Sequence, residues 1–183
     1  MRETALLLID VQKGLDDPSL GKRNNPDAES NIALLLSKWR DHALPIVHVR
    51  HCSVKPDSPL RPELPGNAFK AEAEPLPGEI EFTKTTHSAF VATGLEDYFR
   101  EQGISSLVIA GLTTDHCVSA STRMAADLGF KITLVSDATA AFERVGYDGL
   151  LYSGDEIHRV NLVSLDGEFC TVRSTQEVLG EIA

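Results

Sequence analysis

Short, uninterrupted apolar runs alternate with longer amphipathic runs along this chain of 183 residues. Runs such as 5–9 and 107–110 lack the apolar–polar alternation of a half-exposed strand, which is typical of strands buried on both faces of a parallel sheet. The runs between them place apolar side chains at helical spacing. We therefore predict an α/β fold: one domain over residues 1–183, a three-layer α/β/α sandwich around a six-stranded, mostly parallel, doubly wound sheet.

The expected elements follow one another in regular order. Strands are predicted at 5–10, 45–50, 81–84, 106–111, 131–137 and 168–172. Helices are predicted at 30–42, 95–102, 115–128 and 155–165, with a last helix opening at the capping-box sequence 174–177. The proline-rich stretch 51–80 and the stretch 139–153 show little periodicity and are predicted as long loops.

Charge and composition exclude several classes of protein. With 27 acidic and 17 basic residues the formal net charge is −10, which argues against nucleic acids and anionic membrane surfaces as partners. No apolar run approaches the roughly 20 residues that span a bilayer, and we expect no export signal. Three widely spaced cysteines argue against a disulfide framework, so we expect a cytoplasmic protein.

Three chemically distinct residues follow predicted strands at the same edge of the sheet. Asp10 ends the first strand, Lys84 ends the third, and Cys117 follows the fourth. Doubly wound sheets bind their ligands at the carboxyl ends of the strands. An acid, a cation and a thiol are the groups that nucleophilic acyl chemistry requires. Each residue alone is more often structural, so the prediction depends on their common location.

Cys117 is the predicted nucleophile. It lies near the expected start of the helix 115–128, where free backbone N–H groups favour a thiolate, and we expect a lowered thiol pKa. Asp10 could take up and return a proton, while Lys84 would keep Asp10 ionised. Cys52 and Cys170 have no helix start beside them and are interpreted as structural.

Three motifs in order resemble the isochorismatase-like cysteine hydrolases, which include nicotinamidases, N-carbamoylsarcosine amidohydrolases and ureidoacrylate amidohydrolases. The motifs are Leu8–Gln12, Lys84–Phe90 and Gly111–Val118. The resemblance implies an Asp–Lys–Cys triad formed by Asp10, Lys84 and Cys117. It further implies a cis peptide bond between Leu112 and Thr113, and an oxyanion hole made by the backbone N–H groups of Thr113 and Cys117.

The same resemblance suggests a substrate pocket and argues against a metal. Leu15 stands where family members often have an aromatic residue, so one wall is expected to be aliphatic. Nicotinamidases carry an Asp-x-His metal motif after the second strand, but this chain has His48-Val-Arg-His51-Cys52 there. We therefore expect no metal and no cofactor. The residues expected to line the pocket are Gln12, Leu15, His87, Phe90, Asp115, His116 and Tyr147.

These observations favour a cysteine-dependent hydrolase that cleaves a non-peptide C–N bond of a small molecule, an amide, carbamoyl or ureido compound, through a thioester. Vinyl-ether hydrolysis of the isochorismatase type and a metal-dependent nicotinamidase remain alternatives. A non-catalytic binding protein has no need of an intact triad, and no glycine-rich nucleotide loop follows the first strand.

We also expect a homodimer or homotetramer, because family members commonly associate. The stretch 51–80 carries apolar residues that need cover, either from a second copy of the chain or from the chain itself if the stretch closes as a lid over its own active site. These residues are Val54, Leu60, Leu64, Phe69 and Leu76.

Overall fold

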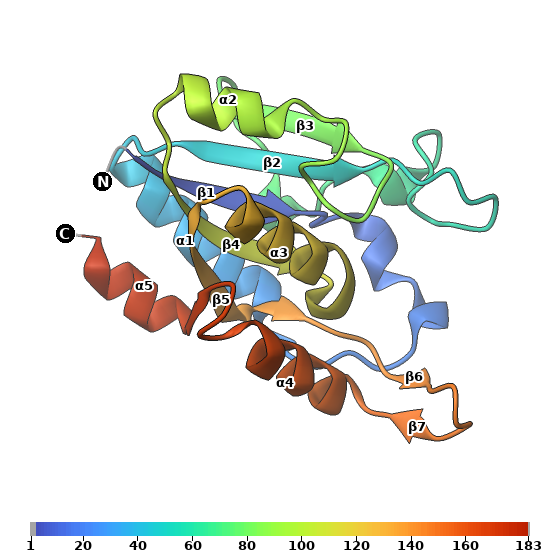
Figure 1. Cartoon of the computed structure of the whole chain (residues 1–183). Helices are drawn as coiled ribbons and strands as arrows, with labels where there is room; N and C mark the ends of the chain where they lie inside the picture. The colour runs from blue at the N-terminus through green and yellow to red at the C-terminus, as the bar shows by residue number, and fades with distance from the viewer. Residues whose placement is uncertain (1–2, 183) are drawn as a thin grey trace.

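The computed structural model describes residues 3–182 and contains the expected six-stranded sheet (Figure 1). The strand order is β3-β2-β1-β4-β5-β8, and every neighbouring pair is parallel. The predicted α/β class is therefore confirmed. The strands are β1 (Thr4–Ile9), β2 (Ile46–His51), β3 (Ile80–Lys84), β4 (Ser106–Leu112), β5 (Lys131–Ala140) and β8 (Thr171–Arg173).

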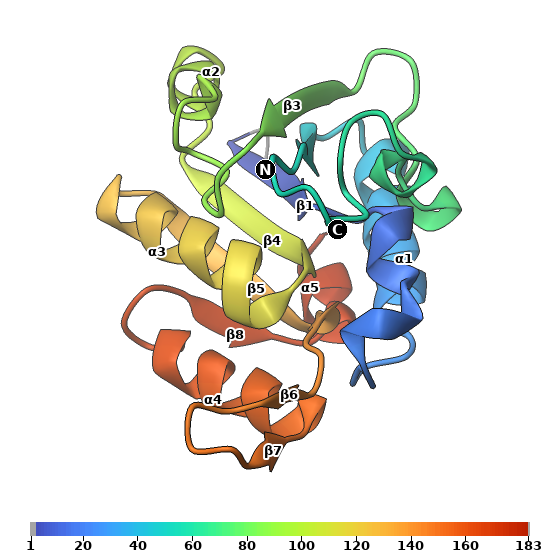
Figure 2. The same ribbon diagram turned by 90° about the vertical axis from the view of Figure 1, so that its right-hand side faces the viewer.

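Helices cover both faces of the sheet (Figure 2). Helices α1 (Ala28–Asp41) and α5 (Thr175–Glu181) pack on one face. Helices α2 (Leu95–Glu101), α3 (Ser119–Asp127) and α4 (Gly154–Leu165) pack on the other. The result is the predicted three-layer sandwich.

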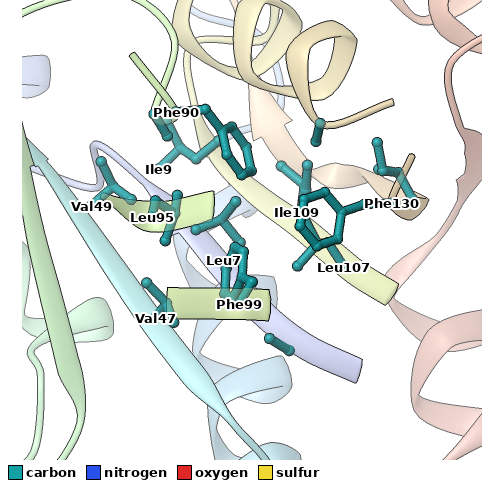
Figure 3. Close-up of a cluster of buried hydrophobic side chains, with 14 of the residues drawn as sticks. Leu7, Ile9, Val47, Val49, Phe90, Leu95, Phe99, Leu107, Ile109 and Phe130 are labelled. Carbon is teal, nitrogen blue, oxygen red and sulfur yellow. The ribbon is translucent and has the colours of Figure 1, made fainter. Parts of the chain in front are cut away.

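Alternate side chains of the central strand β1 supply two separate cores. Leu7 and Ile9 point to the face covered by α2 and α3, where Phe99 packs against them (Figure 3). Leu6 and Leu8 point to the opposite face, where they contact the apolar stripe of α1 that includes Trp39. Because side chains alternate along a strand, a continuous apolar run is the sequence required for a strand buried on both faces.

The structure differs from the sequence prediction at several boundaries. Strand β5 continues to Ala140, and the stretch predicted as a loop after it contains the hairpin β6 (Arg144–Val145) and β7 (Leu151–Tyr152). The helix expected at 115–128 opens with a π-helical turn at Thr114–Val118 before α3. Short 3₁₀ turns lie at Lys13–Asp16, Pro18–Leu20, Pro65–Asn67 and Ala71–Ala73.

Two capping boxes start the last two helices. The side chain of Ser153 accepts a hydrogen bond from the backbone of Glu156 at the start of α4, and Ser174 with Glu177 does the same for α5. Each box satisfies N–H groups that have no partner inside the helix. Within residues 3–182 the chain has no helix with the length and apolar character needed to cross a membrane.

The stretch 51–80 folds back on its own chain. The side chain of Gln12 donates to the carbonyls of His51 (3.0 Å) and Asn67 (2.8 Å) and accepts from the N–H of His51 (2.8 Å). Phe69 is buried within the domain, whereas Val54, Leu64 and Leu76 remain exposed. The chain itself therefore covers only part of the apolar surface of this stretch.

Candidate active site

Three strands deliver the predicted catalytic side chains to the carboxyl edge of the sheet. Asp10 follows β1 directly and has a left-handed backbone, with φ of 53°. Lys84 is the last residue of β3, level with His51 on β2. Cys117 lies in the π-helical turn after β4. A non-glycine residue in the left-handed region stores strain, which is common where function fixes a side chain.

Asp10 and Lys84 form a buried ion pair. Lys84 Nζ lies 2.6 Å from Asp10 Oδ2, and the two side chains are 0% and 2% exposed. The same ammonium donates to His51 Nδ1 and to the carbonyl of Thr86, each at 3.1 Å. An ammonium has three N–H donors, so each has an acceptor here.

The second oxygen of Asp10 is left for other chemistry. Asp10 Oδ1 is buried and accepts no hydrogen bond from any described residue. Ligand atoms of Asp10, His51 and Cys117 all lie within 4.8 Å of one another. The carboxylate therefore has an oxygen without a hydrogen-bond partner and lies near the thiol, where it can act as a proton acceptor.

Burial controls the protonation of both groups. It raises the pKa of the Cys117 thiol to about 12; the charge of Asp10 adds to this rise and Lys84 opposes it. Burial also raises the pKa of Asp10 against the effect of Lys84. The prediction of a low-pKa thiolate is wrong, because desolvation outweighs the helix start.

The turn that carries Cys117 departs abruptly from β4. Gly111 has φ of 127°, and a Cβ there would lie 2.1 Å from the carbonyl oxygen of Ile9, so only glycine lets β1 and β4 approach this closely. The peptide bond between Leu112 and Thr113 is cis. The carbonyl of Thr113 then accepts from the N–H groups of His116 (3.1 Å) and Val118 (3.2 Å).

A cavity of about 290 Å³ opens beside the thiol. It contains Asp10, Cys117 and three of the residues predicted to line a pocket, Leu15, His87 and His116. Asp115 turns away from it and pairs with Arg144 at 2.5 Å. The complete lining among the described residues is Asp10, Leu15, Leu20, His51, Ser53, Val54, Lys55, Ser58, Leu60, Thr85, His87, Leu112, Thr113, His116 and Cys117.

Besides Asp115, three more predicted pocket residues lie elsewhere. The amide of Gln12 is used to hold the 51–80 stretch, as described above. Phe90 packs in the apolar core, with its ring centroid 6.2 Å from that of Phe99 and 6.0 Å from that of Phe130. Tyr147 is fully exposed on the β6–β7 hairpin. Their positions depend on loop paths, which residue type and spacing do not determine.

The sequence analysis missed most of the wall supplied by the 51–80 stretch, including Ser53, Lys55 and Ser58. It also gave His51 no role, although His51 ends β2 at the same edge of the sheet as Asp10 and Lys84. The rule that ligands bind at the carboxyl ends of strands would have selected His51.

His48 and His51 point to opposite faces, as their spacing predicts. His48 Nε2 lies 2.8 Å from Glu79, far from the thiol, while His51 lies against Lys84. Burial and the charge of Lys84 lower the pKa of His51 to about 4, so this imidazole is neutral near pH 7. Lys84 can only donate, which makes His51 Nδ1 the acceptor.

Asp10, His51 and Cys117 offer one donor atom each to a metal ion. The Lys84 ammonium already bonds two of these three groups, at 2.6 and 3.1 Å. A metal ion at their centre would therefore meet a positive charge at hydrogen-bond distance. The described residues fit a site built around an ammonium better than one built around a metal.

Comparison with known proteins identifies relatives of the whole domain. Residues 4–177 match the isochorismatase domain family. The isochorismatase family protein YrdC of Bacillus subtilis is 41% identical, with 97% of this chain and 95% of that protein covered. Maleamate amidohydrolase of Pseudomonas putida is 27% identical, with 99% and 87% covered.

A solved structure extends the comparison to the fold. An isochorismatase-family protein from Chromobacterium violaceum superimposes with a TM-score of 0.96 at 46% identity, with 100% of this chain and 94% of that chain covered. The family match spans nearly all of the domain, including the strands and the turns that carry the site. The chain belongs to the isochorismatase family.

Proposed function

We propose that this protein is a cysteine-dependent hydrolase of a non-peptide C–N bond in a small molecule. The observation that supports it most is the arrangement around Asp10: one oxygen bonds Lys84, the other has no hydrogen-bond partner among the described residues, and the carboxylate lies within 4.8 Å of Cys117 Sγ. This arrangement allows a thiol to lose its proton at the moment it attacks, without a thiolate formed beforehand.

In the first half of the reaction, Cys117 Sγ attacks the carbonyl carbon of an amide, carbamoyl or ureido group. The thiol proton passes to Asp10 Oδ1, and the backbone N–H groups of Thr113 and Cys117 donate to the oxyanion. Asp10 then gives the proton to the leaving nitrogen, so that ammonia or an amine departs and a thioester remains.

In the second half, water replaces the amine. Asp10, ionised again, takes a proton from the water as the water oxygen attacks the thioester carbonyl. The acid product then leaves, and the sulfur of Cys117 regains a proton. Lys84 takes no part in the proton transfers; the Asp10 carboxylate, His51 and the Thr86 carbonyl accept from its three N–H groups. It keeps Asp10 oriented and offsets its charge.

Similarity to maleamate amidohydrolase supports a C–N bond as the target. Vinyl-ether hydrolysis would leave Cys117 without a part in the chemistry. A metal-dependent nicotinamidase would need the Asp-x-His metal motif after β2, which this chain lacks. The geometry favours the thiol-dependent reaction over both alternatives.

The test is an ammonia-release screen over amides, carbamates and ureas with wild type, Cys117→Ala and the matched control Cys52→Ala. Cys52 is half-buried and lies outside the cavity lining. We expect kcat to fall about 10⁴–10⁶-fold in Cys117→Ala and to stay unchanged in Cys52→Ala. Rapid-quench mass spectrometry should detect the acylated Cys117 peptide. Undiminished turnover by Cys117→Ala would reject the mechanism, and activity lost to EDTA and restored by metal would favour the nicotinamidase alternative.

We further propose that copies of the chain associate. The β6–β7 hairpin exposes Val145, Tyr147, Leu150 and Leu151, and the 51–80 stretch exposes Val54. Burying such side chains against a symmetric partner removes apolar surface from water. Sedimentation equilibrium should give a mass of two or four chains at micromolar concentration. A single species near 20 kDa would contradict this proposal and favour the lid.

A further inference from the structure

The cavity beside Cys117 differs in charge from the rest of the molecule. The chain carries a net charge of −10. Among the described residues that line the cavity, the only acid is Asp10, and its charge is matched by Lys84. Lys55 adds a second cation with no ion-pair partner among residues 3–182. The wall of an acidic protein is therefore locally positive where the substrate must bind.

Two backbone hydrogen bonds hold the turn that carries Lys55. Its backbone N–H donates to the hydroxyl of Ser53 (3.3 Å), and its carbonyl accepts from the N–H of Ser58 (3.2 Å). Ser53 and Ser58 themselves line the cavity. Lys55 thus stands on a turn that is part of the wall, with its ammonium free to meet a ligand.

His116 adds a polar side chain to the same cavity. The guanidinium of Arg144 lies 2.8 Å from His116 Nε2. A guanidinium can only donate, so Nε2 is the acceptor and a neutral His116 carries its proton on Nδ1. His87 faces it with a ring-centroid distance of 5.9 Å, and His87 Nδ1 lies 3.9 Å from Cys117 Sγ. Two imidazoles therefore line the cavity, and that of His87 lies beside the thiol.

The positive groups act on one another. Burial lowers the pKa of His116, and the nearby charges of Arg144 and Lys55 lower it further against the effect of Asp115. By linkage, an anion bound among these groups would raise the same pKa. Arg144 and Lys55 thus place positive charge near His116, which an anionic ligand would offset.

The remaining wall is aliphatic and small. It is formed by Leu15, Leu20, Val54 and Leu60 in a cavity of about 290 Å³. We propose, on the basis of the function proposed above, that the substrate is a short carboxylate-bearing amide. Its amide carbon meets Cys117, its carbon chain lies on the aliphatic wall, and its carboxylate faces Lys55. Lys55 is then the residue that selects anionic over neutral amides.

Succinamate and butyramide form a suitable probe pair, because they share an amide and a short chain and differ in the carboxylate. We expect wild type to favour succinamate by about tenfold or more in kcat/KM, and Lys55→Met to reduce that ratio about tenfold. Lys55→Arg should retain most of it. Lys131→Met, which removes an equivalent charge at the amino edge of the sheet, should leave the ratio unchanged. The wild-type ratio should also fall as salt is raised.

Binding separates failure of this proposal from failure of the proposed function. In Cys117→Ala, succinate should shift the His116 imidazole resonance saturably and raise the His116 pKa, the neutral diamide succinamide should not, and Lys55→Met should weaken the succinate effect. Two active amides with equal kcat/KM, or a ratio that Lys55→Met does not change, would overturn the proposal. Where neither amide is hydrolysed, the proposed function fails for this class, and absence of a Lys55-dependent succinate shift overturns the anion site as well.

Discussion

Asp10 and Glu29 each bond a buried lysine at 2.6 Å, Asp10 with Lys84 and Glu29 with Lys70. The pKa values of the two carboxyl groups nevertheless shift in opposite directions. Burial raises the pKa of Asp10 despite Lys84. Burial also opposes ionised Glu29, but hydrogen bonds from Arg23 and Lys70 overcome it and lower the pKa to about 2. Equal ion-pair distance therefore does not mean equal chemistry.

The difference lies in the unused oxygen. Both oxygens of Glu29 are bonded, because Arg23 binds them at 2.5 and 2.7 Å and Lys70 adds a third contact. Asp10 has Lys84 on one oxygen and nothing from the described residues on the other. A carboxylate with both oxygens bonded stays ionised, and Glu29 joins α1 to the 51–80 stretch. A carboxylate with one oxygen free can accept a proton.

The largest effect should come from neutralising each carboxylate in turn. Asp10→Asn removes the proton acceptor and should lower kcat about 10²–10⁴-fold without unfolding the domain. Glu29→Gln should change kcat only slightly. Steady-state ammonia release with circular dichroism of both variants tests this contrast. Comparable losses in the two variants would mean that Asp10 acts through structure alone.

Removing each lysine should cost stability at both pairs. Lys84→Met leaves the buried Asp10 carboxylate unpaired, and breaking a buried pair from one side typically costs about 3–5 kcal/mol. Lys70→Met should cost less, because Arg23 still bonds both oxygens of Glu29. The double variant Asp10→Asn/Lys84→Met should recover much of the unfolding free energy but no activity. Urea unfolding of the three variants provides the measurement. If the double variant is less stable than Lys84→Met, the carboxylate was not the source of the loss.

Lowering the pH should change the contributions of the two pairs to the unfolding free energy in opposite directions. Glu29, whose pKa falls from 4.5 to about 2 on folding, contributes stability that is complete above about pH 4.5 and is lost as pH falls through 2. That contribution is about 3 kcal/mol. Glu29→Gln should therefore flatten the acid limb of stability against pH. Asp10 has the opposite sign, because its raised pKa favours the folded state at low pH, so Asp10→Asn should steepen that limb.

The smallest effect concerns the thiol. The charge of Asp10 contributes to the raised pKa of Cys117, so Asp10→Asn should lower that pKa. Alkylation of Cys117 by iodoacetamide at pH 8 should then be faster, by about tenfold for each pH unit by which the pKa falls. Glu29→Gln should leave the rate unchanged. Peptide mapping by mass spectrometry distinguishes Cys117 from Cys52 and Cys170. Slower labelling in Asp10→Asn would show that Asp10 instead favours the thiolate.

Sequence reasoning located Asp10, Lys84 and Cys117 because strand order and the carboxyl-edge rule operate on patterns that a sequence displays. It could not set the thiol pKa, because the depth at which Cys117 lies is a property of the packed domain. Gln12 and Phe90 belong to motifs that carry site residues, yet one anchors a loop and the other fills the core.

The ion-pair partners could not be predicted from the sequence either. Glu29 is 41 residues from Lys70 along the chain, and in the sequence it has the ordinary pattern of an acid in the first turn of a helix. Lys55 is separated from Cys117 by two strands and a helix, and only the path of the 51–80 stretch brings it to the cavity. Loop paths depend on hydrogen bonds such as those of Asn67, which no local periodicity reports.

The pairing of β1 with β4 has a consequence for biosynthesis. Thr4 lies opposite Ser106, and Ile9 lies opposite Gly111. At about 5–20 residues per second, translation takes roughly 5–20 s to make the hundred residues between these partners. Throughout that interval the nascent chain presents β1, its most apolar strand, with one backbone edge open, which is the condition under which strands pair with the wrong neighbour. Emergence of β4 closes that edge and brings the nucleophile's turn to Asp10, so the ribosome completes the sheet centre and the catalytic edge in the same event.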